Sequence, residues 1–188
     1  MAKNTKLSLS TALLELLEAK PLDKITVTEL VKKCGVNRQT FYYNFRDIYD
    51  LVEWTIMEDV NPFLTGVVQG KDIRRNMIAL LNFMKNNRRV IVNIANSISR
   101  STLERYEMEQ LHKYIGAIID NRAKGIPLSP ENREFIIRAY SLGIVGLIFD
   151  WIHGDMQNDI TEFVDKFLSI ADGSLPTVID RMNKTIKN

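Results

Sequence analysis

Cysteine and histidine are scarce in this chain of 188 residues, which contains one cysteine and two histidines. The single cysteine, Cys34, excludes an intramolecular disulfide and argues against a metal site built from thiolates. The two histidines, His112 and His153, lie in neither a His-x-x-x-His pattern nor a cysteine-rich segment, so no metal site is predicted. We expect Cys34 to pack as a small residue near a turn, and we expect no cofactor.

Long apolar runs are also missing, since no stretch approaches the length of a membrane span and the start MAKNTKLS has no signal-peptide core. These absences predict a cytoplasmic protein that makes no membrane contact. Catalytic motifs are missing too: there is no glycine-rich phosphate loop and no G-x-S-x-G elbow. Glu104, Glu107 and Glu109 lie beside Arg100 and Arg105, which is typical of a solvated face. The chain is therefore not expected to be an enzyme.

The composition is that of an ordinary globular protein, with 45% hydrophobic and 26% charged residues. Charge is unevenly distributed. Residues 1–46 contain eight basic and four acidic residues, a net charge of +4, so the remainder carries −2 of the chain's total of +2. A basic segment on a slightly acidic body is typical of a protein that contacts phosphate at one end.

The segment 25–45, ITVTELVKKCGVNRQTFYYNF, predicts two short helices joined by a tight turn. Thr26 and Glu29 have the spacing of a capping box, which starts a helix. Gly35 stands where a helix ends in the left-handed region, and Asn37 is a good N-cap for the next helix. Phe41 and Phe45 lie one helical turn apart and so share a buried face. This is the pattern of a helix-turn-helix whose second helix enters the major groove.

Two short helices and a glycine turn also occur in all-helical proteins that never bind nucleic acid. The residue types on the outward face favour DNA binding here, because no Asp or Glu occurs from Val36 to Phe45. A face that merely contacts solvent would mix both signs of charge.

The run ITVTELVKKCGVNRQTFYYNFRDIYDLVEW resembles the N-terminal domain of the TetR family of bacterial transcription regulators. The matching features are Thr26-Val27, Cys34-Gly35-Val36, Thr40-Phe41-Tyr42 and Phe45. Within the family, TFYYNFRDIYDLVEW is most similar to a subgroup that includes regulators of dihydroxyacetone kinase operons.

The candidate DNA contacts combine groups for base edges with groups for phosphate. Arg38 can fork onto guanine or hold a phosphate, Gln39 can read adenine, and Tyr43 can lie against a thymine methyl. The resemblance implies that the same positions face DNA. The full set of candidate contacts is Lys24, Thr26, Thr28, Arg38, Gln39, Thr40, Tyr42, Tyr43, Asn44 and Arg46.

One position departs from the family pattern. The family commonly has a phosphate-binding lysine where this chain has Ile48. Losing one phosphate contact lowers the salt dependence of binding by about one unit of slope, and Arg46 is the nearby residue that could compensate.

We expect an all-α fold with an N-terminal three-helix helix-turn-helix domain over 1–47 and a larger helical bundle for dimerisation and effector binding over 48–188. The first helix is expected over about Leu7–Ala19. The fourth is expected to end at Asn61-Pro62, with 63–70 as a connection. The remaining helices of the bundle are expected at about 73–84, 88–99, 102–121, 130–151 and 159–171, with a break at 173–176 before a short terminal helix.

The segment from Ile136 to Trp151 is apolar nearly all round, so it must be covered on more than one side. It is either central within the monomer or packs with the next helix across a two-fold axis. The resemblance supports the second arrangement, because the family usually dimerises through its last two long helices. The candidate interface residues are Tyr140, Gly143, Gly146, Leu147, Asp150, Trp151, Phe163 and Phe167.

The resemblance also implies a small-molecule effector that binds in the body. Aromatic and methionine residues there are candidate pocket walls, although residues of this kind more often form plain core. They are Trp54, Met77, Met84, Tyr106, Met108 and Tyr140. The predicted function is a homodimeric repressor that binds a palindromic double-stranded operator and responds to an effector. The alternative is a partner-dependent co-regulator or activator that acts mainly through another protein.

Overall fold

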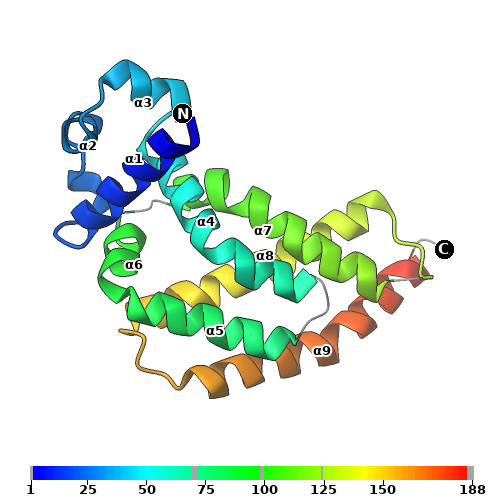
Figure 1. Ribbon diagram of the computed structural model, residues 1–188. Coiled ribbons are helices and arrows are strands. Elements are labelled where there is room, and N and C mark those ends of the chain that lie inside the picture. The colour runs from blue at the N-terminus through cyan, green and yellow to red at the C-terminus, as the bar shows by residue number, and fades with distance from the viewer. Residues whose placement is uncertain (1, 69–71, 98–99, 124, 186–188) are drawn as a thin grey trace. The chain divides into compact units, whose positions relative to one another are not determined.

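The structure is a computed structural model that describes residues 2–68, 72–97, 100–123 and 125–185. Within these ranges the protein consists of α-helices and one 3-10 turn, without a strand, which confirms the all-α fold (Figure 1). The helices are α1 (Ala2–Leu17), α2 (Val27–Cys34), α3 (Arg38–Asn44), α4 (Ile48–Val68), α5 (Ile73–Asn86), α6 (Arg88–Ala95), α7 (Arg100–Arg122), α8 (Pro130–His153) and α9 (Ile160–Thr185).

The chain divides into two compact units. The first unit comprises Met1–Pro62 and Met84–Glu107, and the second comprises Phe63–Phe83 and Met108–Asn188. The helix-turn-helix therefore shares a unit with α6, which follows it by more than forty residues. Whether 1–47 and 48–188 act as separate functional domains stays a prediction.

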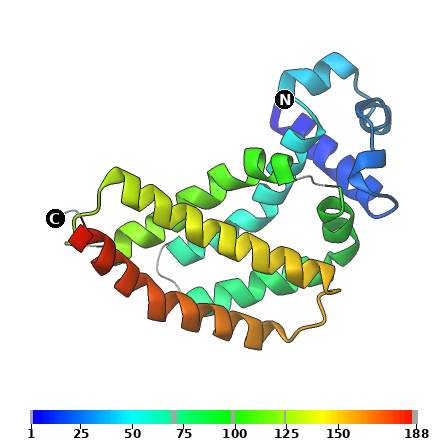
Figure 2. The same cartoon turned by 180° about the vertical axis from the view of Figure 1, so that it is seen from behind.

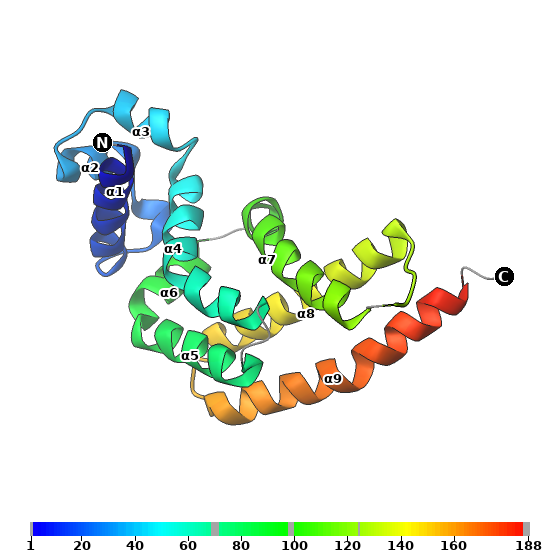
Figure 3. The ribbon, with the colours of Figure 1, turned by 45° about the vertical axis from the view of Figure 1, so that its right-hand side comes forward.

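The core of the first unit is built on α1. Leu9, Leu13 and Leu17 are fully buried and lie four residues apart, on one face of this helix. The buried side chains that pack with them come from α2, α3, α4 and α6; these are Leu30, Val31, Phe41, Leu51, Val52, Val90 and Ile94. Figure 3 shows α1, α2 and α3 as the compact group from which α4 departs. This shared core fixes α2 and α3 in place.

The second unit contains a long pair of helices, α8 and α9, which run side by side in opposite directions (Figure 2). Ile136 and Ile137, near the start of α8, form a buried cluster with Leu175 and Ile179, near the end of α9. At the opposite end of the pair, the rings of Trp151 and Phe163 lie 6.3 Å apart. The pair is therefore held together along its length.

Two predicted helix ends are wrong, and both lie at a proline. A proline inside a helix removes one backbone hydrogen bond and crowds the preceding turn. Even so, α4 continues through Pro62 to Val68, so the expected connection over 63–70 is helical as far as the structure describes it. Phe63 stacks near Phe83 of α5, with ring centroids 5.9 Å apart, and packing of this kind compensates for the proline.

The prediction of a break in the last helix between residues 173 and 176 is also wrong, because packing again outweighs the effect of a proline. Helix α9 runs unbroken through Gly173 and Pro176 to Thr185. Leu175 and Ile179 continue its buried stripe against α8, and burying such side chains is worth about 1.5–3 kcal/mol each. Other helix ends also differ from the prediction. Helix α1 spans Ala2–Leu17, where Leu7–Ala19 is predicted. Helix α6 ends at Ala95, whereas the predicted end, Ser99, lies outside the described residues.

Helix α8 has 24 residues with a mean hydropathy of 1.7 in its most apolar window, so by length and composition alone it is able to cross a membrane. The expectation that no apolar stretch approaches this length is therefore wrong. A core helix of a helical bundle meets the same criteria, and Ile136, Ile137, Trp151 and Ile152 of α8 are buried within the second unit.

Candidate nucleic-acid interface and ligand cavity

At the start of α2, one of the two hydrogen bonds of the predicted capping box is described. The hydroxyl of Thr26 accepts a hydrogen bond of 3.2 Å from the backbone N–H of Glu29. The carboxylate of Glu29 does not complete the capping box among the contacts described; its two oxygens lie 2.8 and 2.6 Å from Nζ of Lys20. Glu29 thereby ties α2 to the end of α1 and neutralises a lysine.

The turn and the start of α3 follow the sequence signals. Gly35 has a φ of 68°, the left-handed conformation that favours glycine. The side-chain oxygen of Asn37 accepts a hydrogen bond of 2.8 Å from the backbone N–H of Thr40, which caps α3. Phe41 and Phe45 are buried in the first unit. The helix-turn-helix is thus built from local caps and two aromatic anchors.

The opposite face of α3 carries the predicted base-reading side chains in solvent. Tyr43 is 83% exposed and Tyr42 is 50% exposed, and Arg38 and Gln39 are also exposed. Tyr42 and Tyr43 are therefore accessible to a ligand, whereas Phe41 and Phe45 are buried in the core.

Arg38 connects α2 with α3. Its guanidinium donates to the hydroxyl of Thr28 and to the hydroxyl of Tyr42, both at 3.4 Å, and lies 5.9 Å from the centroid of the Tyr42 ring. These long hydrogen bonds orient the arginine without saturating its five donors. Thr28, Arg38 and Tyr42 therefore form one polar surface drawn from both helices.

Other candidate contacts have local partners. The hydroxyl of Thr40 donates to Asn37 at 3.0 Å, and the amide of Asn44 donates to the carbonyl of Thr40 at 2.7 Å. Lys24 is well exposed and lies 3.3 Å from Asp23. Thr40 and Asn44 thus stabilise α3 itself, while Lys24 has a side chain long enough to reach phosphate.

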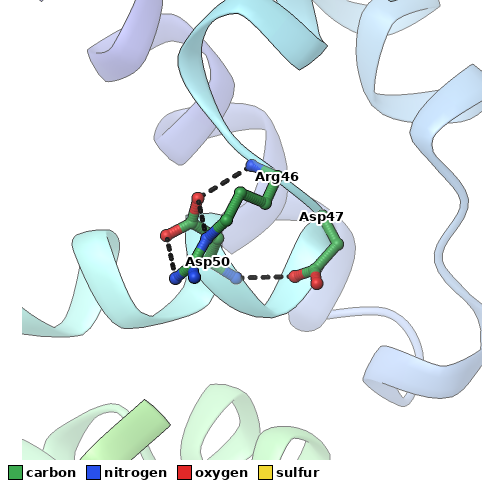
Figure 4. A network of polar contacts seen from close by, with 3 residues as sticks. All are labelled: Arg46, Asp47 and Asp50. Carbon is green, nitrogen blue, oxygen red and sulfur yellow. Dashed lines mark hydrogen bonds and ion pairs between the residues drawn. The ribbon is translucent and has the colours of Figure 1, made fainter. Parts of the chain in front are cut away.

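Ile48 takes the place of the phosphate-binding lysine that is common in the family, and Arg46 is the nearby residue that could replace this contact. Figure 4 shows Arg46 folded back onto Asp50, with its backbone N–H 2.8 Å from Oδ2 and its Nη2 3.4 Å from Oδ1. Asp47 caps the start of α4 by accepting from the backbone N–H of Asp50 at 2.9 Å. Ile48 packs against the core of the first unit. Arg46 must release or share Asp50 if it is to bind a phosphate.

The electrostatics of the first unit favour an anion at α3. Glu15 and Glu29 face lysines of the unit, Lys33 at 2.6 Å and Lys20 at 2.6 Å. The charge of these two carboxylates is therefore offset locally, and α3 itself contains no Asp or Glu.

Cys34 lies at the end of α2 with its thiol 3.3 Å from the carbonyl oxygen of Ser8. Burial raises the pKa of the Cys34 thiol, while the neighbouring Lys33 acts to lower it. A thiol held protonated is a poor nucleophile, so Cys34 acts as a packing residue.

The second unit contains an apolar cavity of about 130 Å³. Of the predicted pocket residues, Met77 and Tyr140 line it. Trp54 instead packs on the core of the first unit, 6.0 Å from the ring of Phe45, and the nitrogen of Lys6 lies over both rings. Met84 also belongs to the first unit, and the side chains of Tyr106 and Met108 lie outside the described residues.

Phe63 and Leu64, which are not among the predicted pocket residues, line the cavity from the last turns of α4. They were assigned to a connection because Pro62 precedes them. Their apolar character directly after an apolar helix was the signal that could have placed them in the bundle.

The candidate interface residues divide between two environments. Gly143, Gly146, Leu147 and Asp150 lie on an exposed face of α8, and a Cβ added at either glycine meets nothing within 4 Å. Three further exposed apolar side chains belong to α8 and α9; they are Phe135, Leu142 and Ile170. The other candidates face inward: Tyr140, Phe163 and Phe167 line the cavity, and Trp151 is buried.

Two family models match the chain. The model described as "Bacterial regulatory proteins, tetR family" matches residues 9–54, which include the helix-turn-helix. The model described as "Transcriptional regulator C-terminal region" matches residues 71–173, more than half of the chain. No curated protein sequence matches the chain.

Solved structures share the fold at low identity. The chain is similar to the "Dihydroxyacetone kinase operon activator DhaS", with a TM-score of 0.62 and 17% identity over 91% of this chain and 96% of that one. It is also similar to a TetR transcriptional regulator from Streptococcus agalactiae 2603V, with a TM-score of 0.57 and 16% identity over 90% of this chain and 94% of that one. A third similar structure is NalD, the secondary repressor of the MexAB-OprM multidrug efflux pump in Pseudomonas aeruginosa. Its TM-score is 0.53, with 18% identity over 90% of this chain and 95% of that one. At these identities the likeness concerns the fold alone.

Proposed function

The chain belongs to the TetR family of bacterial transcription regulators, and from this premise we propose that it is a cytoplasmic repressor. In this proposal it binds a palindromic operator as a homodimer and is released or modulated by a small molecule, without catalytic activity of its own. The observation that carries the proposal is the outward face of α3, where Arg38, Gln39, Tyr42 and Tyr43 are exposed together.

The chemistry of this face suits double-stranded DNA. A guanidinium held by Thr28 and Tyr42 at 3.4 Å can present its remaining donors to guanine in the major groove. Tyr43 offers a ring for a thymine methyl, and Thr26 and Lys24 flank the helix as phosphate contacts. Thr40 and Asn44 are proposed to contribute by fixing α3, in addition to any phosphate contact.

Homodimerisation is supported by the exposed face of α8 and α9. Phe135 and Ile170 are each more than 60% exposed, and the glycines at 143 and 146 leave room for the backbone of a second helix to approach. A two-fold dimer would present its two α3 helices to half-sites one DNA turn apart, about 34–36 Å.

A second candidate is a partner-dependent co-regulator or activator. Two observations favour it: a half-buried Ile48 packs against the core at the position where a phosphate-binding lysine is common in the family, and Arg46 is folded onto Asp50. Such a protein would bind DNA weakly by itself and act through contacts with another protein.

The deciding experiment is the selection of bound duplexes from a random DNA pool by the purified chain alone, at near-physiological salt. Enrichment of an inverted repeat supports the direct regulator, and the spacing of the repeat gives the separation of the two α3 helices. The control is the double variant Arg38→Ala with Tyr43→Ala, which should enrich nothing while remaining folded. If the unaltered protein also enriches nothing while folded and dimeric, the partner-dependent reading replaces the direct one.

A further inference from the structure

The cavity of the second unit is walled almost entirely by hydrocarbon. It is lined by the last turns of α4 and by α5, α7, α8 and α9. Among the residues that the structure describes, seventeen that line it are aliphatic, Phe, Met or Ala, and five, Asn76, Tyr114, Arg122, Tyr140 and Asp172, carry a polar group. A wall of this kind favours a ligand that loses little hydration on entry.

The two charges at the cavity are paired with each other. Nη2 of Arg122 lies 2.8 Å from Oδ1 of Asp172, and both side chains are about half exposed. The pair therefore lies where water reaches it. A charged ligand would have to break this pair or enter the hydrocarbon without a counter-charge, and burying an unpaired charge is strongly unfavourable.

Hydrogen-bonding capacity inside the wall is also mostly used. The hydroxyl of Ser174 donates its one proton to the carbonyl oxygen of Ile170 at 2.7 Å. The hydroxyl of Tyr140, which lies 2.7 Å from the same Ser174 oxygen, must then be the donor in that contact. The amide of Asn76 donates to the carbonyl oxygen of Asp72 at 3.0 Å. A ligand rich in hydroxyl groups would leave most of them unsatisfied, at a cost of about 1–3 kcal/mol each.

The volume limits the size of the ligand. An engineered apolar cavity of about 150 Å³ in another protein stays dry and binds benzene, and the cavity here is about 130 Å³. We infer that this cavity binds a neutral, apolar molecule about the size of a single aromatic ring, and that it rejects carboxylates and small polyols. Binding itself requires only the cavity, whereas its role as the regulatory signal rests on the function proposed above.

The test is thermal unfolding of the full chain, without DNA, in the presence of four probes: toluene, benzoate, glycerol and dihydroxyacetone. Toluene and benzoate share a ring and differ in charge, so they separate apolar fit from carboxylate recognition. At about ten times its dissociation constant, toluene should raise the melting temperature by roughly 3–5 °C. The other three should leave it unchanged at equal concentration. Stabilisation by benzoate or by either polyol, with none by toluene, overturns the assignment.

A filled cavity should lose the response. Ala171 lines the cavity, so Ala171→Leu should weaken toluene binding at least tenfold, and Ile144→Phe serves as a second filling variant if the first does not fold. Thr161→Leu is the matched control, because Thr161 is exposed near the start of α9, does not line the cavity and is not among the residues proposed for the dimer interface. Toluene binding that survives both filling variants would place the ligand elsewhere and overturn the inference.

The regulatory role is tested separately on the operator obtained from the duplex selection. If toluene binds the cavity and changes operator affinity at least tenfold, the cavity is the effector site. If toluene binds and operator affinity is unchanged, the ligand class stands and the regulatory role is overturned. If no operator is enriched at all, the proposed function fails while the thermal result still decides the ligand class.

Discussion

The side-chain amide of Asn93 in α6 donates a hydrogen bond of 2.7 Å to the carbonyl oxygen of Leu17, the last residue of α1. The last carbonyls of a helix have no partner within the helix, so Asn93 satisfies one of them from 76 residues away. Val90 and Ile94 of the same helix are buried in the core of the first unit. A short helix distant in sequence thus completes the unit that carries the helix-turn-helix.

Replacing Asn93 with alanine should lower the free energy of unfolding by about 1–2 kcal/mol, because the partly buried carbonyl of Leu17 loses its donor. The measurement is urea denaturation followed by circular dichroism. Asn82→Ala is the matched control, since Asn82 is exposed and donates to the carbonyl of Ile78 one turn earlier in the same helix, and should cost less than about 0.5 kcal/mol. Equal losses in the two variants would show that the contact between α6 and α1 contributes nothing special.

Replacing Tyr43 with alanine should weaken operator binding by about 1–3 kcal/mol, five- to 150-fold, because the side chain is proposed to lie against a base. Its stability should stay within about 0.5 kcal/mol of the unaltered protein, since the ring is 83% exposed. Fluorescence anisotropy with the selected duplex measures the first effect and thermal unfolding the second. Tyr43→Phe keeps the ring and should retain most of the affinity; if Tyr43→Ala binds as well as the unaltered protein, Tyr43 is not a contact.

Introducing a lysine at Ile48 should make DNA binding more dependent on salt. Each added phosphate contact steepens the slope of log affinity against log salt by about 0.9, and a lysine at this half-buried position can lay its stem along the core. Operator affinity measured from 50 to 200 mM salt gives the slope.

Asp50→Asn tests whether Arg46 can supply the phosphate contact that Ile48 cannot make. This variant removes the negative charge that holds Arg46. Its slope should steepen similarly if the freed arginine reaches phosphate. Ile48→Leu should leave the slope unchanged. An unaltered slope in Ile48→Lys would mean that this position does not face the DNA backbone in this protein.

Placing a charge at Leu142 should disrupt the proposed homodimer. Leu142 is 45% exposed on the same face of α8 as Gly143 and Gly146, and an unpaired carboxylate at the centre of an apolar interface is costly. Sedimentation velocity should show a shift of Leu142→Glu from dimer to monomer. Asn158→Glu, in the exposed connection after α8, should remain dimeric; a dimer that persists in Leu142→Glu would mean that another surface mediates association.

Local signals were sufficient to predict the helix-turn-helix. Thr26, Gly35, Asn37 and Phe41 act within a few residues of their own positions, so the sequence contains the information about their caps, turn and anchor directly. The completed capping box was not realised, because Lys20, nine residues before Glu29, competes for its carboxylate. Competition of this kind depends on how α1 and α2 pack.

The errors lie where distant packing overrides a local rule. Pro62 and Pro176 are helix breakers by any local criterion, yet Phe63 meets Phe83 and Leu175 meets the start of α8. In the same way, Trp54 was predicted as a pocket wall from its residue type, whereas it packs against Phe45 beneath Lys6. The neighbours of these residues come from other helices, and a single sequence does not reveal such pairings.

The division of α4 between the two units has a consequence for protein engineering. Ile48, Leu51 and Trp54 belong to the core around α1, and α6 returns to that core after α5 has passed through the other unit. A chimaera that grafts residues 1–47 alone onto another regulator would leave this core open on two sides. A transplant that preserves recognition must carry α4 as far as Pro62 together with α6, so the exchangeable part of this regulator is discontinuous in the gene.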